Sequence, residues 1–399
     1  MKYSHFFKLI SLLLALILLL PLAAACGKEG QEAITTDTEQ AATTEPEVTT
    51  EEPKPKCTVL LRELEGTVDI HTEGQAKYLA GPYTAVSKYA EGAEELSHPA
   101  PIVLRWDLDT ESTEIVRRFY VKVGMKPDLS DAVEYRCFDQ FYNLYNVFLG
   151  ATYYWNVTAF YNEGDEYTSA TSSFTVTSTP PRNMYVDGVS NVRDLGGWTT
   201  EDGGKVRQGL IYRCGRLNKN KSTTDQITYQ GKKTMLDVMG VKSELDLRLT
   251  ENNESGNLTQ SPLGKTVTYY AFPMVYSTNK LTSENNPEMI RQIFALLADE
   301  SNYPIIFHCS IGTDRTGLIA WLINGLLGVS KENLWRDYLY SNFGNIGSSR
   351  SMSNIADEYV NILDAAPGST LSEKIYNYLK GIGIPEEQLN SIIRILKEN

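Results

Sequence analysis

The chain has few histidines, no paired-cysteine metal motif and no excess of positive charge. Its 399 residues include 4 histidines and 5 cysteines, and no two cysteines are spaced as Cys-x-x-Cys. Because that spacing is absent, the common zinc sites are excluded. His308 is the sole histidine of the second half, so a histidine-rich metal centre is excluded there too. The net charge of −13 argues against a nucleic-acid binder. We therefore expect no metal, no cofactor and no nucleic-acid partner.

The chain also lacks a hydrophobic run of full membrane-spanning length. Leu9–Ala25 is short for a transmembrane helix and follows Lys2 and Lys8, which predicts an export signal over residues 1–26. The ending Leu-Ala-Ala-Ala-Cys26 resembles a bacterial lipoprotein signal, which implies lipidation of Cys26 and an anchor on the outer face of the cell membrane. A simple cleaved signal, with secretion, or an uncleaved anchor helix are the alternatives.

Large apolar residues are scarce in residues 27–56, which consist mainly of threonine, glutamate, proline and alanine. A segment of this composition cannot bury enough apolar surface to offset the entropy lost on ordering. We therefore predict a disordered tether between the export signal and the first folded domain.

Alternating apolar and polar residues predict strands across residues 57–180. Such runs lie at 101–107, 118–123, 152–158 and 173–177. Gly, Asn and Asp clusters separate them, which predicts an all-β sandwich. The runs around Trp106 and Trp155 resemble a fibronectin type III domain. A disulfide between Cys57 and Cys137 is left open, since exported domains often carry one.

Pro180-Pro181 marks a boundary, and residues 181–399 are expected to form an α/β domain with a central sheet flanked by helices. Predicted strands lie at 210–213, 241–247, 267–272 and 304–307. Predicted helices lie at 235–239, 288–298, 317–327, 331–340, 355–363, 371–379 and 386–396. The apolar runs before and after residues 308–316 are those of a buried strand and a buried helix.

Between that strand and that helix lies a polar loop with one thiol, Cys309, and one guanidinium, Arg315. A strand, a tight loop and a helix N-terminus form a phosphate cradle, because backbone N–H groups and the helix dipole face an anion. The helix end and a nearby cation lower the pKa of a thiol, so Cys309 is the predicted nucleophile. Arg315 can bind two phosphate oxygens. The predicted substrate-binding residues are Ser310, Ile311, Gly312, Thr313 and Thr316.

These residue types predict covalent catalysis. Cys309 would attack phosphorus to form a phosphocysteine, and water would then cleave it. The Cys–Arg spacing is specific to this loop, because glutamate or asparagine lies six positions after each of the other cysteines.

The string from His308 to Gly317 resembles the signature loop of the cysteine-based protein tyrosine phosphatase superfamily. Further stretches resemble its bacterial tyrosine-and-lipid phosphatase branch. They are Asn191–Gly197, Val206–Leu217, Gly240–Arg248 and Asp337–Asn342. The resemblance covers roughly the last half of the chain. It implies a tyrosine phosphatase-like α/β fold and hydrolysis of phosphomonoesters.

A leaving alkoxide needs a proton donor. The stretch Tyr269–Tyr276, where many relatives carry an acidic loop, holds no carboxylate. The resemblance therefore implies Asp314 as the general acid and Asp194, of the Asn191–Gly197 stretch, as a second candidate. Arg193 of the same stretch is expected to support the site. A carboxylate that only braces the loop is the alternative for Asp314.

Supporting roles follow for several other residues. His308 is expected to orient the surroundings of Cys309, and Asp246 and Arg248 to brace the loop from a neighbouring strand end. Cys214 is interpreted as a buried cysteine, with disulfide protection of Cys309 as the alternative. Thr313 stands where relatives that favour phosphoinositides often carry lysine, which weakens a lipid substrate.

Three functions remain open at this point. The first is a protein tyrosine phosphatase. The second is an extracellular inositol-polyphosphate or phosphoinositide phosphatase, since exported proteins meet few phosphotyrosines. The third is a surface binding protein whose phosphatase half is vestigial, although the presence of both Cys309 and Arg315 opposes it.

Overall fold

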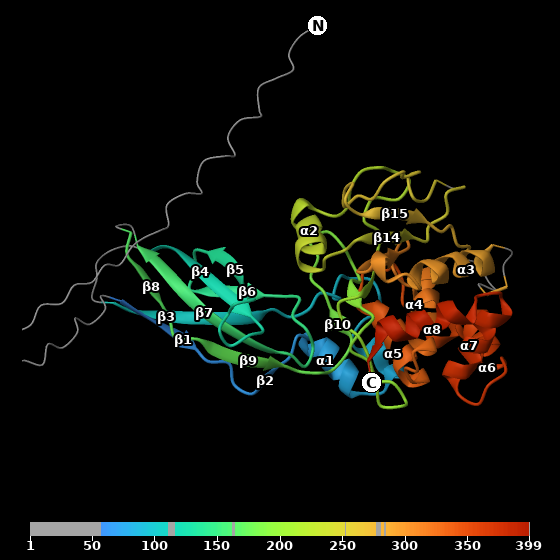
Figure 1. The fold of residues 1–399 in the computed structure, drawn as a ribbon, viewed down its shortest axis with the longest axis horizontal. Coiled ribbons are helices and arrows are strands. Elements are labelled where there is room, and N and C mark those ends of the chain that lie inside the picture. Colours follow the sequence, from blue (N-terminus) through green and yellow to red (C-terminus); the bar gives the residue numbers. More distant parts are fainter. Residues whose placement is uncertain are drawn as a thin grey trace, which may run out of the picture. The chain divides into compact units, whose positions relative to one another are not determined.

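The computed structural model describes residues 57–110, 116–161, 164–251, 253–276, 281–282 and 285–398. The predicted export signal with Cys26, and the predicted tether at 27–56, lie outside the described residues. Residues Pro55–Asn399 form one compact unit (Figure 1). Within the described ranges, no helix is both long enough and apolar enough to cross a bilayer.

Two sheets account for most of the described chain up to residue 176 (Figure 1). The first has the order β1-β3-β6, and the second β2-β9-β7-β4-β5 with β8 paired to β7. The bounds are β1 Cys57–Arg62, β2 Thr67–Val68, β3 Ile102–Thr110, β4 Val116–Gly124, β5 Val133–Cys137, β6 Phe141–Leu144, β7 Thr152–Tyr161, β8 Glu166–Thr168 and β9 Ser172–Val176. Burial alternates along β7, as a strand with one face on a core requires. Trp106, Phe119 and Trp155 belong to the core that both sheets share.

The all-β expectation is wrong between β2 and β3. The chain leaves the sheets there and forms α1 (Glu73–Ala80) and η1 (Tyr83–Lys88) before it returns. Thr72 and Gln75 form a capping box that starts α1. A hydrogen bond of 2.7 Å from the Ala100 N–H to the Ile70 carbonyl closes the base of this segment. We call residues 70–100 the excursion.

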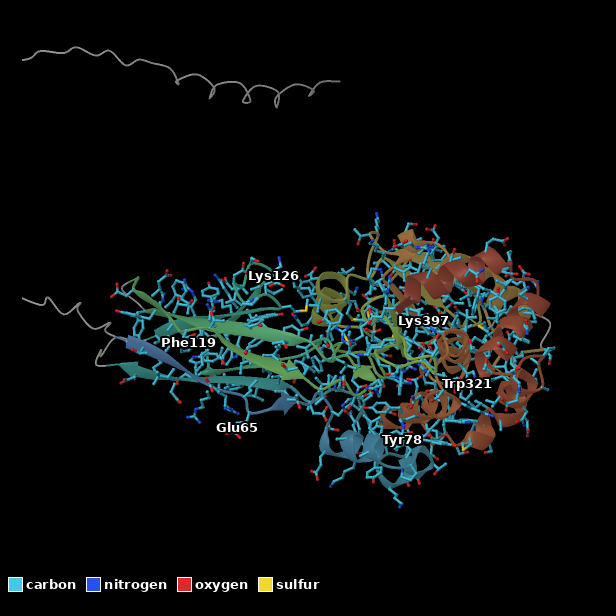
Figure 2. The ribbon with its side chains drawn as sticks, turned by 60° about the horizontal axis from the view of Figure 1, so that its bottom comes forward. Glu65, Tyr78, Phe119, Lys126, Trp321 and Lys397 are labelled. Carbon is cyan, nitrogen blue, oxygen red and sulfur yellow. The ribbon has the colours of Figure 1, made fainter. Side chains whose placement is uncertain are left out.

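The excursion packs into the second half of the molecule. Tyr78, Val86 and Ala90 belong to the same hydrophobic core as Trp321, and Figure 2 shows Tyr78 on the side of the helices. The Tyr78 hydroxyl donates to the Arg336 carbonyl at 3.2 Å. The second half therefore takes part of its core from residues that precede the predicted boundary.

The second half is built on a six-stranded sheet with the order β10-β11-β13-β16-β14-β15. The bounds are β10 Arg182–Asn183, β11 Arg193–Asp194, β13 Ile211–Cys214, β14 Ser243–Asp246, β15 Thr268–Ala271 and β16 Ile305–His308. Strands β13, β16, β14 and β15 run parallel, whereas β11 is antiparallel to β10 and β13. Because β16 lies between β13 and β14, its carboxyl end is at the middle of the edge where parallel sheets bind ligands.

Helices cover both faces of this sheet. They are α2 Tyr229–Lys233, η2 Thr234–Val238, α3 Asn286–Leu297, η3 Glu300–Asn302, α4 Asp314–Leu326, α5 Lys331–Tyr340, η4 Ser341–Phe343, η5 Met352–Asn354, η6 Ala356–Val360, α6 Asn361–Asp364, α7 Leu371–Gly381 and α8 Glu386–Leu396; a small pair of strands, β12 Lys205–Val206 and β17 Lys397–Glu398, lies apart. Phe307 belongs to the same core as α4, whereas Ile306 belongs to a second core with Met235 of η2.

The strands and helices predicted for this half are confirmed, with ends shifted by a few residues. The predicted bounds of α5 and α8 agree with the structure. The helices predicted at 235–239 and 355–363 differ in kind, because each contains a wide turn with i→i+5 hydrogen bonds, η2 and η6.

Candidate active site

The loop after β16 turns tightly into α4. Gly312 has a φ of +72°, and a Cβ at this position would lie 2.4 Å from the carbonyl oxygen of Cys214. Only glycine combines that backbone conformation with so close an approach. The turn from β16 into α4 therefore depends on this residue.

Cys309 lies at the base of the loop and is 1% exposed. Burial acts to raise the pKa of its thiol, but the charge of Arg315 and the neighbouring Thr316 act in the other direction. The net effect places the pKa below the ordinary value of a thiol. The thiolate, which is the nucleophilic form, is therefore easier to form here than in an ordinary cysteine.

Arg315 is held by Glu254, a residue that no sequence motif singles out. The guanidinium donates two hydrogen bonds to the two carboxylate oxygens, of 2.9 Å from Nη1 and 2.7 Å from Nη2. Nη1 also lies 3.2 Å from the Leu247 carbonyl. Among the described residues, the buried Nε has no hydrogen-bond partner. Glu254 thus fixes the edge of the guanidinium that carries Nη1 and Nη2, and the Nε–H can still donate to a bound anion.

Glu254 also binds the loop. The Ser310 hydroxyl donates to its carboxylate, and so does the Leu249 N–H at 3.0 Å. Burial acts to raise the pKa of Glu254, but Arg315 and these hydrogen bonds lower it to about 2. The carboxylate is therefore charged at neutral pH and keeps Arg315 in place.

Asp314, the predicted general acid, is partly exposed and paired with Arg350. The Arg350 Nε lies 3.0 Å from Oδ1 and its Nη2 lies 3.1 Å from Oδ2. Asn342 holds the Arg350 backbone, accepting from its N–H at 2.6 Å and donating to its carbonyl at 2.9 Å. Both oxygens of Asp314 are thus engaged, and one must be released before Asp314 can transfer a proton.

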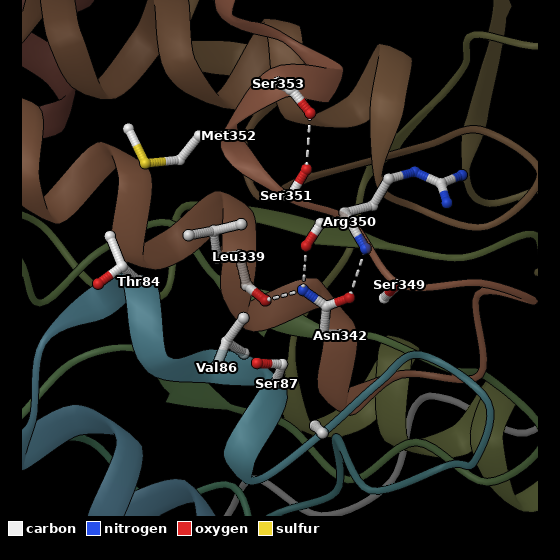
Figure 3. A pocket seen from close by; sticks show the side chains of 11 residues that line it. Thr84, Val86, Ser87, Leu339, Asn342, Ser349, Arg350, Ser351, Met352 and Ser353 are labelled. Atoms are coloured by element: carbon white, nitrogen blue, oxygen red, sulfur yellow. Dashed lines mark hydrogen bonds between the residues drawn. The ribbon is translucent and has the colours of Figure 1, made fainter.

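A cavity of about 420 Å³ lies beside Asn342 and Arg350 (Figure 3). Its lining comes from η1, Ala90, α5, Asn342 and residues 349–353, and includes Val86, Leu339 and Met352. Figure 3 shows the Asn342 amide between Leu339 and the Arg350 backbone. Of the described residues that line it, none comes from the 309–316 loop, so this cavity is separate from the phosphate cradle.

Three of the sequence motifs, Asn191–Gly197, Val206–Leu217 and Asp337–Asn342, meet behind the loop. Asn191 donates to the Gly312 carbonyl at 3.2 Å, and Arg213 donates to the same carbonyl at 2.8 Å. Arg193 and Arg213 both bind Asp337, with distances of 2.7 Å and 2.6 Å. Burial acts to raise the pKa of Asp337, but the two arginines lower it. Arg193 therefore acts through Asp337 and Asn191 on the back of the cradle.

The excursion contacts the Asn191–Gly197 motif. The Asn191 N–H donates to the Ser97 hydroxyl at 2.9 Å, and both residues are buried. The Gly92 N–H donates to the Asn342 carbonyl at 2.8 Å. A serine far upstream thus fixes the asparagine that holds the loop, which no local sequence pattern could indicate.

Asp194, the second candidate for the acid, lies at the junction between the sandwich sheets and the catalytic sheet. It is fully buried and binds Arg182 at 2.8 Å. Burial, opposed by Arg182, raises its pKa. Its other oxygen accepts from the Gly196 N–H at 2.8 Å. These contacts give Asp194 a structural position rather than one in the cradle.

Asp246 and Arg248 pair with each other at the end of β14, with 2.6 Å between Arg248 Nη2 and Asp246 Oδ2. Arg248 also donates to the Asn218 side chain at 2.6 Å. His308 Nδ1 lies 3.9 Å from Asp246 Oδ1 and 3.3 Å from the Cys309 carbonyl oxygen. The pair thus lies next to the cradle, and its link to Cys309 runs through His308.

The four described cysteines are free thiols. Cys57 lies in β1 and Cys137 in β5, on different sheets. Cys214 is buried at the end of β13, and burial raises the pKa of its thiol. In the described part of the chain, no group of three or more His, Cys, Asp or Glu side chains could hold a metal ion.

Comparison with known proteins points to one family. Residues 184–398 match the tyrosine phosphatase family. The chain is 25% identical over 183 residues to tyrosine-protein phosphatase H16_A0669 of Cupriavidus necator, which covers 40% of this chain and 63% of that protein. It is 39% identical over 51 residues to a tyrosine-protein phosphatase of Nostoc commune, 13% of this chain and 17% of that protein. The chain spans less than two thirds of the length of both relatives.

Among solved structures, the core catalytic domain of the PP-IP phosphatase Siw14 from S. cerevisiae, in complex with citrate, superposes with a TM-score of 0.27. The two are 16% identical, and the superposition covers 44% of this chain and 86% of the other.

Proposed function

Since the chain belongs to the tyrosine phosphatase family of cysteine-based phosphatases, we propose that it hydrolyses phosphomonoesters, with phosphotyrosine as the first substrate class. The observation that carries the proposal is the pairing of Cys309 with Arg315. The thiol has a lowered pKa, and the neighbouring guanidinium has a buried Nε without a hydrogen-bond partner in the described part of the chain. A buried N–H donor without a hydrogen-bond partner is costly, and a phosphate oxygen would satisfy it.

In the first step, the Cys309 thiolate attacks phosphorus and the bond from phosphorus to the ester oxygen breaks. Asp314 gives its proton to the leaving oxygen. Arg315 and the N–H groups of the loop stabilise the charge on the phosphoryl oxygens. Glu254 supports this step because it fixes the outer edge of the Arg315 guanidinium.

In the second step, water attacks the phosphocysteine and gives a proton to the Asp314 carboxylate. The sulfur leaves as thiolate and inorganic phosphate is released, so the enzyme returns to its starting state. Asp314 can serve in both steps only if Arg350 releases one carboxylate oxygen. Asp194 is not proposed as the acid, because Arg182 and the Gly196 N–H hold it in the junction.

The substrate is tested by phosphate release from a phosphotyrosine peptide, a phosphoinositide and inositol hexakisphosphate. We expect the highest kcat/KM on the peptide, and none for Cys309→Ser on any substrate. Cys137→Ser, in a partly exposed strand of the sandwich part, is the matched control and should keep full activity. A preference for inositol hexakisphosphate would replace the substrate class, and a wild type inert on all three would leave the vestigial-phosphatase alternative.

The N-terminal features are part of the proposal. We propose that Cys26 is lipidated and anchors the chain outside the cell, and that the two sheets form a fibronectin type III-like sandwich. The shared core of the β1-β3-β6 and β5-β4-β7-β9 sheets supports the second point. Palmitate labelling and membrane fractionation of wild type and Cys26→Ser test the lipid anchor. A Cys26→Ser variant that keeps both the label and the membrane association would contradict lipidation of Cys26.

A further inference from the structure

Three ionisable side chains lie together beneath the nucleophile. Glu244 and Asp246 are two positions apart on β14, so their side chains share one face of the sheet. In the register of β14 and β16, Asp246 lies opposite His308. All three side chains are at most 1% exposed. The contacts of Asp246 with Arg248 explain that residue, but neither the sequence motifs nor the proposed reaction explains Glu244.

The atoms around His308 determine where its protons lie. Nδ1 faces the Cys309 carbonyl oxygen at 3.3 Å and the Asp246 Oδ1 at 3.9 Å. A carbonyl oxygen only accepts, so Nδ1 must carry a proton to bond it. Nε2 lies 2.9 Å from Oε1 of Glu244. The other oxygen of Glu244 accepts from the Ser261 hydroxyl.

The charged and titratable groups facing this site come from several elements. Burial lowers the pKa of His308, but Asp246 and Glu244 raise it, Arg248 opposes them, and the net shift is upward. On Asp246 itself, burial raises the pKa, but His308 and Arg248 lower it, so that carboxylate is ionised. Tyr269 of β15 donates to Asp246 at 3.0 Å, and Glu244 also acts on Cys214 of β13.

We propose that Glu244 is a positioning residue that keeps both ring nitrogens of His308 protonated, so that the Nδ1–H stays donated to the carbonyl of Cys309. This inference rests on the proposed role of Cys309 as the nucleophile. A doubly protonated ring is the stronger donor and places a positive charge below the sulfur. Both effects favour the thiolate over the thiol.

The test replaces Glu244 by glutamine. The amide has the same size and can bond both Ser261 and Nε2, but it lets the ring become neutral. We expect the titration midpoint of the Cys309 thiol to rise by about one pH unit. The midpoint is read from the absorbance of the thiolate as the pH is raised. For each chain, the absorbance of the same chain with Cys309→Ser is subtracted. Ser261→Ala, which removes the other contact of Glu244, is the matched control and should leave the midpoint unchanged.

A second substitution shows whether Glu244 acts through the imidazole. In a chain with His308→Asn the midpoint should already be raised, and Glu244→Gln added to it should raise it no further. A further rise there, or an unchanged midpoint in Glu244→Gln alone, would overturn the inference. If Glu244→Gln does not fold, the nitrogen chemical shifts of His308 in the intact chain decide, since a neutral ring at pH 7 is incompatible with the proposal.

The titration needs no turnover. Inactivity on every phosphoester would therefore contradict the proposed function and leave the link from Glu244 to Cys309 standing. An active wild type with an unchanged midpoint in Glu244→Gln would contradict the link from Glu244 to Cys309 and leave the proposed function standing.

Discussion

At the scale of single residues, the contacts of Asp314 and Arg315 matter most. Each of these neighbours in the chain is held by an opposite charge from a different loop, Asp314 by Arg350 and Arg315 by Glu254. The first pair must open if Asp314 is to act as an acid. The second pair can stay closed, because it leaves the Nε of Arg315 without a partner among the described residues.

Asp314→Asn shows whether Asp314 acts as the general acid or only supports the loop. An acid matters most for a poor leaving group, so we expect kcat on phosphotyrosine to fall by about 100-fold and kcat on p-nitrophenyl phosphate by less than about tenfold. Arg350→Ala keeps the acid and removes the ion pair that must open, so its kcat on phosphotyrosine should not fall relative to its kcat on p-nitrophenyl phosphate. Equal losses on both substrates for Asp314→Asn would remove Asp314 from the acid role.

Glu254 gives a pH dependence with a definite sign. Its pKa is about 2 in the folded chain and about 4.3 when unfolded. Its contribution to stability is therefore fully present above the unfolded value and is lost as the pH falls through the folded one. We expect Glu254→Gln to be less stable than wild type at pH 7, with the difference shrinking toward pH 2. Urea unfolding at several pH values measures this.

Glu251→Gln is the control for that experiment. Glu251 lies in the same loop with its side chain exposed, so the substitution should leave the unfolding free energy unchanged at every pH. A Glu254→Gln variant as stable as wild type at pH 7 would show that Arg315 does not depend on this carboxylate.

At the scale of elements, the loop between β16 and α4 depends on Gly312. In Gly312→Ala the Cβ meets the Cys214 backbone at 2.4 Å in a left-handed conformation, and we expect a loss of about 2–4 kcal/mol in unfolding free energy together with most of the activity. Gly203→Ala has a similar φ but no atom within 4 Å, and should cost about 1 kcal/mol. Equal effects in thermal and urea unfolding would contradict the role of the close approach.

Local signals explain which parts of this element could be predicted. The cradle was predictable because a strand, a loop and a helix follow one another in the chain. The start of α8 was predictable because Pro385 directly precedes the helix. Glu254, Arg350 and Ser97 reach the loop from distant segments, and nothing in their own neighbourhoods indicates that contact. Helix α1 carries a local start signal, the Thr72–Gln75 capping box, but it is short, and its Tyr78 packs into the core of the second half.

At the scale of the whole molecule, the excursion joins the two halves. A chain beginning at residue 181 lacks Tyr78, Val86, Ala90 and the Ser97 contact to Asn191. We expect it to melt at least several degrees below a chain beginning at residue 57, since losing one large buried side chain alone costs about 3 kcal/mol. Equal melting temperatures by calorimetry would show that the catalytic half is self-sufficient.

A matched substitution keeps the chain intact. Ser97→Ala in the full chain removes the hydroxyl that accepts from the Asn191 N–H and donates to Glu95, and should lower kcat more than it lowers the melting temperature. Ser87→Ala, on η1 beside the cavity of Figure 3, should change neither.

The path of the excursion has a consequence for how such a protein can evolve. Gene fusion and recombination move contiguous stretches of chain, and residues 70–100 lie between two strands of the sandwich sheets while their side chains complete the catalytic core. A donor module spliced in place of the sandwich would carry those side chains away. The two halves of this protein are therefore expected to be inherited together rather than exchanged separately.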